Sequence, residues 1–251
     1  MSSSSTTAAT RRFPWKSVLD ALTSVVLIAA AVTLVWFNLS SRSPSRPDPS
    51  APSAPVSIEH AALKGSSNAK AVMIVFSDFE CPFCGTFARD TMPKLEREYV
   101  TTGRLQLAYR YLPLPKHPNA RGAAQASECA KQQGQFWSMH DRLFTSGAQL
   151  DVQGVHAIAT SLDLDDAAYA RCLTEETTKA AVSRDSEHAK ALGLESTPAF
   201  LLGLRTEDGR VRVSKAFYGA LPSDEFRTEI ERAMNPPDSW FKRVFGVSLW
   251  R

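Results

Sequence analysis

The tightest constraint on this chain is a pair of cysteines, Cys81 and Cys84, that directly follows an apolar run. The run, residues 72–76, has the length and composition of a buried strand. Residues 81–100 then form a predicted helix, which Pro93 should kink because proline removes one backbone hydrogen bond. A strand that leads into a helix places both thiols in the first helical turn.

The start of a helix favours reactive cysteine chemistry, because it carries a partial positive charge and unpaired N–H groups. Both features should lower the pKa of Cys81 and favour the thiolate, which is the attacking species in disulfide exchange. Cys84 lies one turn later, where it can close a disulfide with Cys81 or resolve a mixed one. Pro82 suits a first helical turn, whereas Glu80 acts in the opposite direction, because a nearby anion disfavours a thiolate.

A zinc site and an inert structural pair are the alternatives for these two cysteines. Structural zinc commonly takes four ligands from two such pairs, but this chain has no second C-x-x-C and no histidines at ligand spacing. The strand-to-helix setting argues against an inert pair. The sequence favours a redox pair, with no metal and no cofactor beyond a Cys81–Cys84 disulfide.

The N-terminal part has the composition of a membrane anchor. Residues 18–39 are mostly apolar and about as long as a bilayer requires. Arg11, Arg12 and Lys16 precede them, which predicts a cytoplasmic segment at 1–17 and a catalytic domain on the other side. A cleaved signal peptide is the alternative, although the apolar run is long and no clear cleavage site follows it.

Two further segments flank a predicted domain at 56–234. Residues 40–55 contain five prolines and several serines, which predicts an extended linker. Residues 235–251 form a tail with aromatic and basic side chains that could touch a membrane surface or pack back on the domain. The net charge of +3 is too small to indicate nucleic-acid binding.

Hydrophobic patterns divide the rest of the domain into strands and helices. The predicted elements are a strand at 104–112, a helical block at about 114–192, a hairpin of strands at 198–204 and 210–217, and a helix from Ser223. This order is that of the thioredoxin core with helices inserted into it. The predicted fold class is α/β, a thioredoxin fold with an inserted helical domain, preceded by a single transmembrane helix.

Residues 76–85 resemble the active-site segment of the DsbA-like branch of thioredoxin-fold thiol–disulfide oxidoreductases. The resemblance covers about 56–234 in an ordered series of matches: His117-Pro118, Ala123–Ala126, Cys129-Ala130, Gln133–Trp137, His140–Phe144, Ser196–Phe200 and Gly219. It implies a protein thiol–disulfide oxidoreductase whose substrates are cysteine-containing exported polypeptides. It also implies a membrane redox partner that resets the Cys81–Cys84 pair.

The resemblance further implies roles for individual residues. Pro198 would be a cis-proline beside the cysteine pair, whereas only ~5–6% of X-Pro bonds in folded proteins are cis. Thr197 would offer backbone groups to an extended substrate, and the inserted helices would sit over the site. Phe83 stands where strong oxidases of the family carry a histidine, and with Pro82 it is expected to tune the redox potential.

The predicted function is disulfide formation at a bacterial cell membrane, with the catalytic domain on the periplasmic or cell-wall side. A reductase or isomerase of the same fold is an alternative, because Phe83 cannot favour a thiolate and a threonine before the cis-proline is common in such proteins. A non-catalytic module that grips extended peptides near Pro198 is a second alternative. Nothing before the core indicates a dimerisation domain, so a monomer is expected.

Two cysteines remain, in different predicted helices. Cys129 and Cys172 are expected to form a structural disulfide in an extracytoplasmic domain, and two free buried thiols are the alternative. Other candidate side chains receive no catalytic role: His140 is expected to be a core or capping residue, His117 a loop residue, and Asp78 and Glu59 solvated carboxylates.

Overall fold

The computed structural model describes residues 27–33, 48–145 and 148–235, and the chain divides into two compact units at Pro47. In the first unit, residues 27–33 form an exposed helix. No helix within the described ranges is long and apolar enough to cross a membrane.

Four sequence predictions concern segments that lie mostly outside the described residues. The cytoplasmic segment at 1–17, most of the anchor at 18–39, the first half of the linker at 40–55 and nearly all of the tail at 235–251 lie outside the described residues. These four assignments stay predictions.

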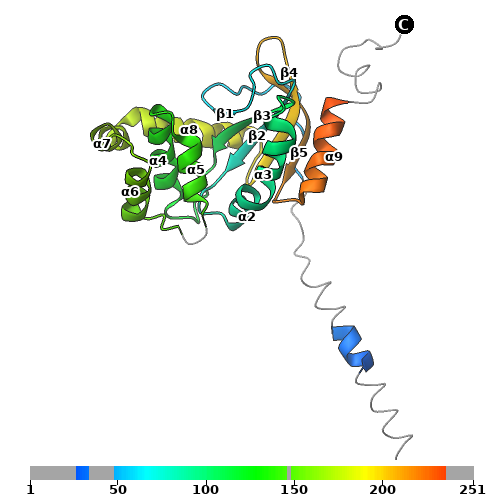
Figure 1. The fold of residues 1–251 in the computed structure, drawn as a ribbon. Helices are drawn as coiled ribbons and strands as arrows, with labels where there is room; N and C mark the ends of the chain where they lie inside the picture. Colours follow the sequence, from blue (N-terminus) through cyan, green and yellow to red (C-terminus); the bar gives the residue numbers. More distant parts are fainter. Residues whose placement is uncertain (1–26, 34–47, 146–147, 236–251) are drawn as a thin grey trace, which may run out of the picture. The chain divides into compact units, whose positions relative to one another are not determined.

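A five-stranded sheet forms the centre of the second unit, in the order β1-β3-β2-β4-β5 (Figure 1). Strands β2 (Ala71–Ser77) and β3 (Leu105–Tyr111) run parallel and are buried at every position, as expected for a sheet covered on both faces. Strands β4 (Ala199–Arg205) and β5 (Val211–Tyr218) form an antiparallel hairpin beside β2. These four match the predicted strands to within one or two residues, whereas β1 (Ala62–Lys64) was not predicted, because three residues show no alternation.

The helical run that carries the cysteines continues to Val100 and alternates between α and π turns. Its parts are α2 (Pro82–Thr86), η1 (Phe87–Thr91), α3 (Met92–Leu95) and η2 (Glu96–Val100). Just before Pro93, the Met92 N–H donates to the Phe87 carbonyl, which is the wider π spacing. The predicted helix is therefore confirmed, and its irregularity near the proline takes the form of a π turn.

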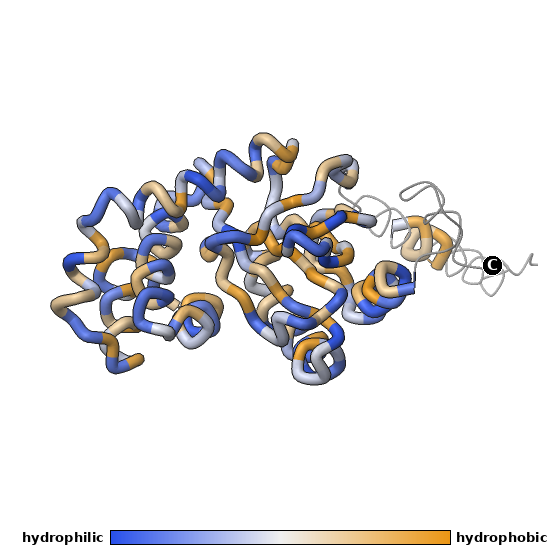
Figure 2. The backbone as a smooth tube through the Cα atoms, turned by 90° about the horizontal axis from the view of Figure 1, so that it is seen from above, coloured by the Kyte–Doolittle hydropathy of each residue, from blue (hydrophilic) through white to orange (hydrophobic). Residues whose placement is uncertain are grey.

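Five helices are inserted between β3 and β4, to one side of the sheet in Figure 1. They are α4 (Ala120–Gln132), α5 (Phe136–Leu143), α6 (Val152–Ser161), α7 (Asp166–Thr174) and α8 (Glu176–Ala191). Figure 2 shows hydrophobic and hydrophilic stretches alternating along them, as expected of helices with one buried face. The predicted helical insertion is thus present.

A last helix, α9 (Ser223–Met234), packs on the sheet through an aromatic cluster. The Phe226 ring lies 4.8 Å from that of Phe200 and 5.3 Å from those of Phe87 and Phe217, measured between centroids. These rings come from α9, β4, β5 and η1. One aromatic cluster thus packs the helical run at 82–100, here called the cysteine helix, against the sheet.

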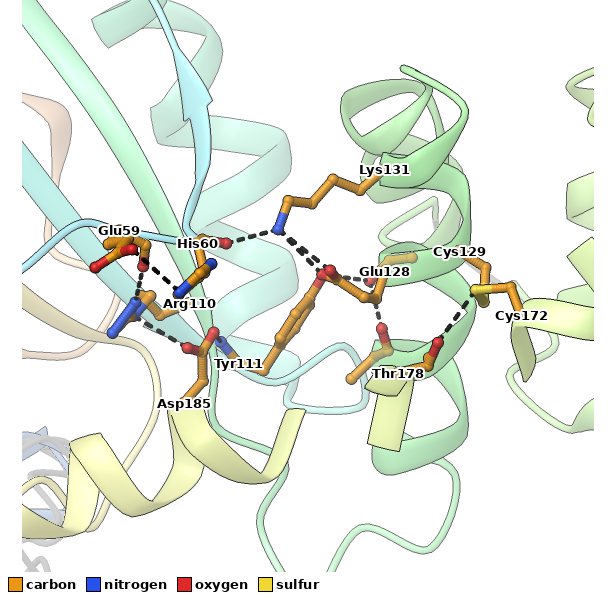
Figure 3. A network of polar contacts seen from close by, with 12 residues as sticks. Glu59, His60, Arg110, Tyr111, Glu128, Cys129, Lys131, Cys172, Thr178 and Asp185 are labelled. Atoms are coloured by element: carbon orange, nitrogen blue, oxygen red, sulfur yellow. Dashed lines mark hydrogen bonds and ion pairs between the residues drawn. A yellow bond between two sulfur atoms is a disulfide. The ribbon is translucent and has the colours of Figure 1, made fainter. Parts of the chain in front are cut away.

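A buried ion pair joins the insertion to the sheet (Figure 3). Arg110 Nε of β3 lies 3.2 Å from Asp185 Oδ1 of α8, and both side chains are only 4% exposed. The Arg110 guanidinium also donates to the Glu59 carbonyl at 2.6 Å and lies 2.6 Å from His188 Nδ1, while Asp185 accepts the Tyr111 N–H at 3.0 Å. Because both charges are buried, removing either side chain of the pair would leave the charge of the other uncompensated.

A disulfide links two helices within the insertion. Cys129 of α4 and Cys172 of α7 are bonded, with their Cα atoms 5.7 Å apart, so the structure forms the pairing expected from the sequence. The Thr178 hydroxyl donates to Cys172 Sγ at 3.2 Å, since a bonded sulfur has no proton to give.

Removing this disulfide should destabilise the protein without removing its exchange chemistry. For a sequence separation of 43 residues, the chain-entropy model predicts that the double change Cys129→Ala and Cys172→Ala lowers the free energy of unfolding by about 4 kcal/mol. Guanidinium denaturation measures this. The control variant Thr178→Val replaces the hydroxyl that contacts Cys172 and should lower the free energy of unfolding by about 1 kcal/mol. An unchanged denaturation midpoint in the double cysteine variant would contradict the expected role of the disulfide.

His188 should make stability depend on pH. A guanidinium only donates, so His188 Nδ1 accepts and the imidazole is neutral. Burial, and then the Arg110 charge, lowers the His188 pKa below its ordinary value. His188 therefore binds a proton less readily in the folded protein than in the unfolded chain. Its contribution to the free energy of unfolding is fully present above the unfolded pKa of about 6.5 and is lost as the pH falls toward the folded pKa.

Urea denaturation at pH 7, 6 and 5 tests this. The free energy of unfolding should fall with pH less steeply in His188→Gln than in the wild type. The exposed His156 supplies the control, and His156→Gln should keep the wild-type slope. Equal slopes in wild type and His188→Gln would show that His188 is not responsible.

Candidate active site

Cys81 and Cys84 occupy the first turn of α2, as the sequence predicted. Cys81 is the N-cap, with φ −76° and ψ 121°, and its carbonyl accepts the Gly85 N–H at 3.1 Å. Both cysteines are free thiols, 6% and 1% exposed, whereas Pro82 and Phe83 between them are exposed. The two sulfur-bearing side chains therefore lie beneath two exposed apolar residues.

The segment before β4 brings a second loop to the pair. The Thr197–Pro198 peptide bond is cis, as the family resemblance implied. Cys81 Sγ donates to the Thr197 carbonyl at 3.4 Å, across 116 residues of sequence. The cis-proline loop therefore lies directly beside the Cys81 sulfur.

The two thiols differ strongly in acidity. The hydrogen bond from Cys84 lowers the pKa of Cys81 to about 5, with smaller contributions from Thr197 and from the backbone N–H groups of Cys84 and Phe83, against the effect of burial. Burial, and then the proximity of Cys81, raises the pKa of Cys84 well above its ordinary value. At neutral pH the thiolate form is therefore favoured at Cys81 and the protonated thiol at Cys84.

Asp78 is a buried structural carboxylate, so the expectation that it is solvated is wrong. It is 1% exposed and accepts the N–H groups of Glu80 at 2.8 Å and Leu114 at 2.7 Å. Its Oδ2 also lies 2.7 Å from His117 Nδ1. His117, which received no role from the sequence, thereby helps to hold the loop after β3 beside the cysteine segment.

Glu80 caps the first helix of the insertion. Its carboxylate accepts the N–H groups of Asn119 at 2.7 Å and Ala120 at 3.0 Å, at the start of α4, and the Asn119 side-chain amide at 3.1 Å. The positive end of α4 therefore faces the negative charge of Glu80, which was expected to disfavour the Cys81 thiolate. Glu59 lies elsewhere, and its 77% exposed side chain is the solvated carboxylate that was expected.

A family model described as thioredoxin matches residues 58–216, most of the second unit. The chain belongs to the thioredoxin family.

Solved structures refine this assignment at the level of the fold. Wolbachia pipientis alpha-DsbA1 is 22% identical, and the match covers 72% of this chain and 94% of that protein with a TM-score of 0.64. BdbD from Bacillus subtilis, also 22% identical, matches 74% of this chain and 98% of its own, with a TM-score of 0.63. This thioredoxin-family chain therefore has a DsbA-like fold, with five inserted helices and the Cys81–Cys84 pair at the start of α2.

Curated relatives are longer proteins. A segment of the Na(+)/H(+) antiporter NhaA 3 of Salinispora tropica is 30% identical over 179 residues, covering 70% of this chain and 27% of the antiporter. The antiporter NhaA of Herminiimonas arsenicoxydans is 31% identical over 148 residues, covering 59% of this chain and 23% of the antiporter. The chain spans about a quarter of the length of the curated relatives it matches.

His140 of this thioredoxin-family domain is a buried residue, in keeping with its predicted place on an apolar face. Its ring centroid lies 4.9 Å from that of Phe144 and 5.3 Å from that of Tyr109. Across the described part of the chain, no three His, Cys, Asp or Glu side chains are placed to hold a metal ion.

Cys84 should control the acidity of Cys81. Thiolate absorbance at 240 nm should show the reduced wild type titrating near pH 5. In Cys84→Ala the midpoint should rise, because the largest contribution that lowers the pKa is removed. Cys84→Ser, which keeps a hydroxyl donor, should rise less. A wild-type midpoint near the ordinary value of about 8.5 would contradict this account.

Proposed function

We propose that this chain forms disulfides in cysteine-containing exported polypeptides. The observation that carries the proposal is the position of the Cys81 sulfur at the N-cap of α2, beside the buried Cys84 and the cis Thr197–Pro198 bond, where its pKa is lowered to about 5. A low thiolate pKa stabilises the reduced dithiol relative to the disulfide, and a pair whose reduced form is stabilised is a stronger oxidant. This favours transfer of the disulfide from the enzyme to its substrate.

The reaction is two successive thiol–disulfide exchanges. A substrate thiolate attacks Cys81 Sγ of the Cys81–Cys84 disulfide, and Cys84 leaves as a thiolate and takes up a proton. A second substrate thiolate then attacks the substrate sulfur of the mixed disulfide and displaces Cys81. Because Cys81 has a low pKa, it is a good leaving group. Two electrons pass from the substrate to the cysteine pair.

The exposed surface around the pair suits a polypeptide substrate. Phe83 is 62% exposed although it is a large apolar residue, and Pro82 beside it is exposed as well. Together with the Thr197–Pro198 loop, they would contact an extended chain on both sides of its cysteine. This arrangement supports a role for Phe83 in substrate contact in addition to the expected tuning of the potential.

An extracytoplasmic location at a bacterial membrane belongs to the proposal. The Cys129–Cys172 disulfide supports an oxidising compartment, and the apolar residues 18–39 followed by a proline-rich linker support an anchor. The matched segments of antiporters support a thioredoxin-family domain at a membrane. A membrane redox partner would reoxidise the Cys81–Cys84 pair after each cycle.

Reduction or isomerisation is the second candidate, because Phe83 supplies no charge to stabilise the thiolate and Thr197 precedes the cis-proline. The reduction potential separates the two directions. A potential more oxidising than about −180 mV would support disulfide formation, and one near about −270 mV, as in thioredoxin, would support reduction.

The exchange activity should depend on Cys81. Wild-type protein should speed the oxidation of reduced, unfolded ribonuclease in a glutathione buffer, and Cys81→Ser should reduce this rate to the uncatalysed level. The charge-adding variant Phe83→His should raise the potential, since an imidazolium would stabilise the thiolate. Equal rates with wild type and Cys81→Ser would instead favour a non-catalytic peptide-binding module.

A further inference from the structure

A small cavity lies behind the cysteine pair. It measures about 10 Å³ and is lined by Cys84 and by side chains of β2, β3, the cysteine helix and α5, including Ser77, Tyr109, Trp137 and His140. Every lining residue except Trp137 is buried. The space is close to the ~10–15 Å³ that one water requires.

Cys84 needs a proton acceptor before it can react, and a side chain that lines this cavity can be that acceptor. To resolve a mixed disulfide on Cys81, Cys84 must first become a thiolate. Burial raises its pKa well above the ordinary value, so few Cys84 thiols ionise at neutral pH. Solvent has little access to a side chain that is 1% exposed. A proton acceptor within the protein would remove this barrier.

His140 is the suitable base among the described residues that line the cavity. Ser77 and Trp137 do not titrate near neutrality. Burial raises the pKa of Tyr109 well above its ordinary value, and the Tyr109 hydroxyl has no hydrogen-bond partner in the described part of the chain. An imidazole, by contrast, exchanges protons in this pH range.

The surroundings of His140 prepare it to accept a proton. Its Nδ1 lies 2.8 Å from Asp141 Oδ1, so in the neutral ring Nδ1 carries the hydrogen and Nε2 carries the lone pair. Burial lowers the pKa of His140, which keeps the ring neutral, and Asp141 opposes that shift. The other charges that act on the ring are Lys64 of β1 and Glu96 of η2, which pair with each other at 2.6 Å.

We propose that His140 accepts the proton of Cys84 across this cavity, with Asp141 stabilising the imidazolium that forms. The inference rests on the proposed exchange function. The Cys84 S–H bond breaks, its proton passes to His140 Nε2, and the thiolate attacks Cys81 Sγ of the mixed disulfide. The Cys81–Cys84 bond forms as the substrate sulfur leaves as a thiolate. When the enzyme acts as an oxidant, the imidazolium returns the proton to the departing Cys84.

Ellman's reagent resolves the two steps, because each releases one thionitrobenzoate that absorbs at 412 nm. The first release comes from attack by Cys81 and the second from attack by Cys84. In His140→Gln the first release should keep its wild-type rate, and the second should slow by about 100-fold at pH 7. Between pH 7 and 9 the slow second release should then rise about tenfold per pH unit as Cys84 ionises directly, whereas the wild-type rate should be level.

Two further variants keep the result decisive. Asp141→Asn changes a side chain that is 60% exposed, and it should slow only the second release, by roughly threefold to tenfold, because the imidazolium loses its counter-charge. His156→Gln, on the exposed surface, should leave both releases unchanged.

A second release at the wild-type rate, with the wild-type pH profile, in His140→Gln would overturn the proposal. Should that variant not fold, an unaltered second release in Asp141→Asn would overturn it equally. If the wild type gave no first release, the proposed exchange function itself would be refuted. A failure of that function can therefore be told apart from a failure of the role proposed for His140.

Discussion

The contact between the Cys81 sulfur and its neighbours is the interaction on which the rest of this structure depends. Cys84 hydrogen-bonds to this sulfur and lowers the Cys81 pKa to about 5, while burial keeps Cys84 itself protonated. Two identical side chains, three residues apart, thereby acquire opposite roles. Because the stabilised thiolate is also a stabilised reduced state, the same contact connects acidity to the direction of electron flow.

Much of the surrounding structure keeps that contact in place. Asp78 and Glu80, on either side of Phe79, accept hydrogen bonds from the loop after β3 and from the start of α4. Further away, the buried pair of Arg110 and Asp185 fixes α8 to the sheet. The helical insertion is thus attached to the active-site segment by carboxylates whose partners lie tens of residues away in sequence.

Sequence patterns predicted what depends on local periodicity and composition: four of the five strands, the cysteine helix and the helical block. The cis bond at Pro198 followed only from family resemblance, since local preference favours trans. The burial of Asp78 and Arg110 was missed, because Leu114 lies 36 residues from Asp78, Asp185 lies 75 residues from Arg110, and no local pattern marks these pairs. A carboxylate directly after a strand that is apolar except for Ser77 was the available signal for Asp78.

In the proposed reaction Cys81, and no other cysteine, receives the substrate sulfur. The direct measurement is mass spectrometry of the Cys84→Ser variant after incubation with a disulfide-containing peptide and acid quenching. We expect one peptide per chain, attached at Cys81, and no accumulation of this adduct in the wild type, where Cys84 resolves it. Attachment at another position, or a variant that forms no adduct, would contradict the account.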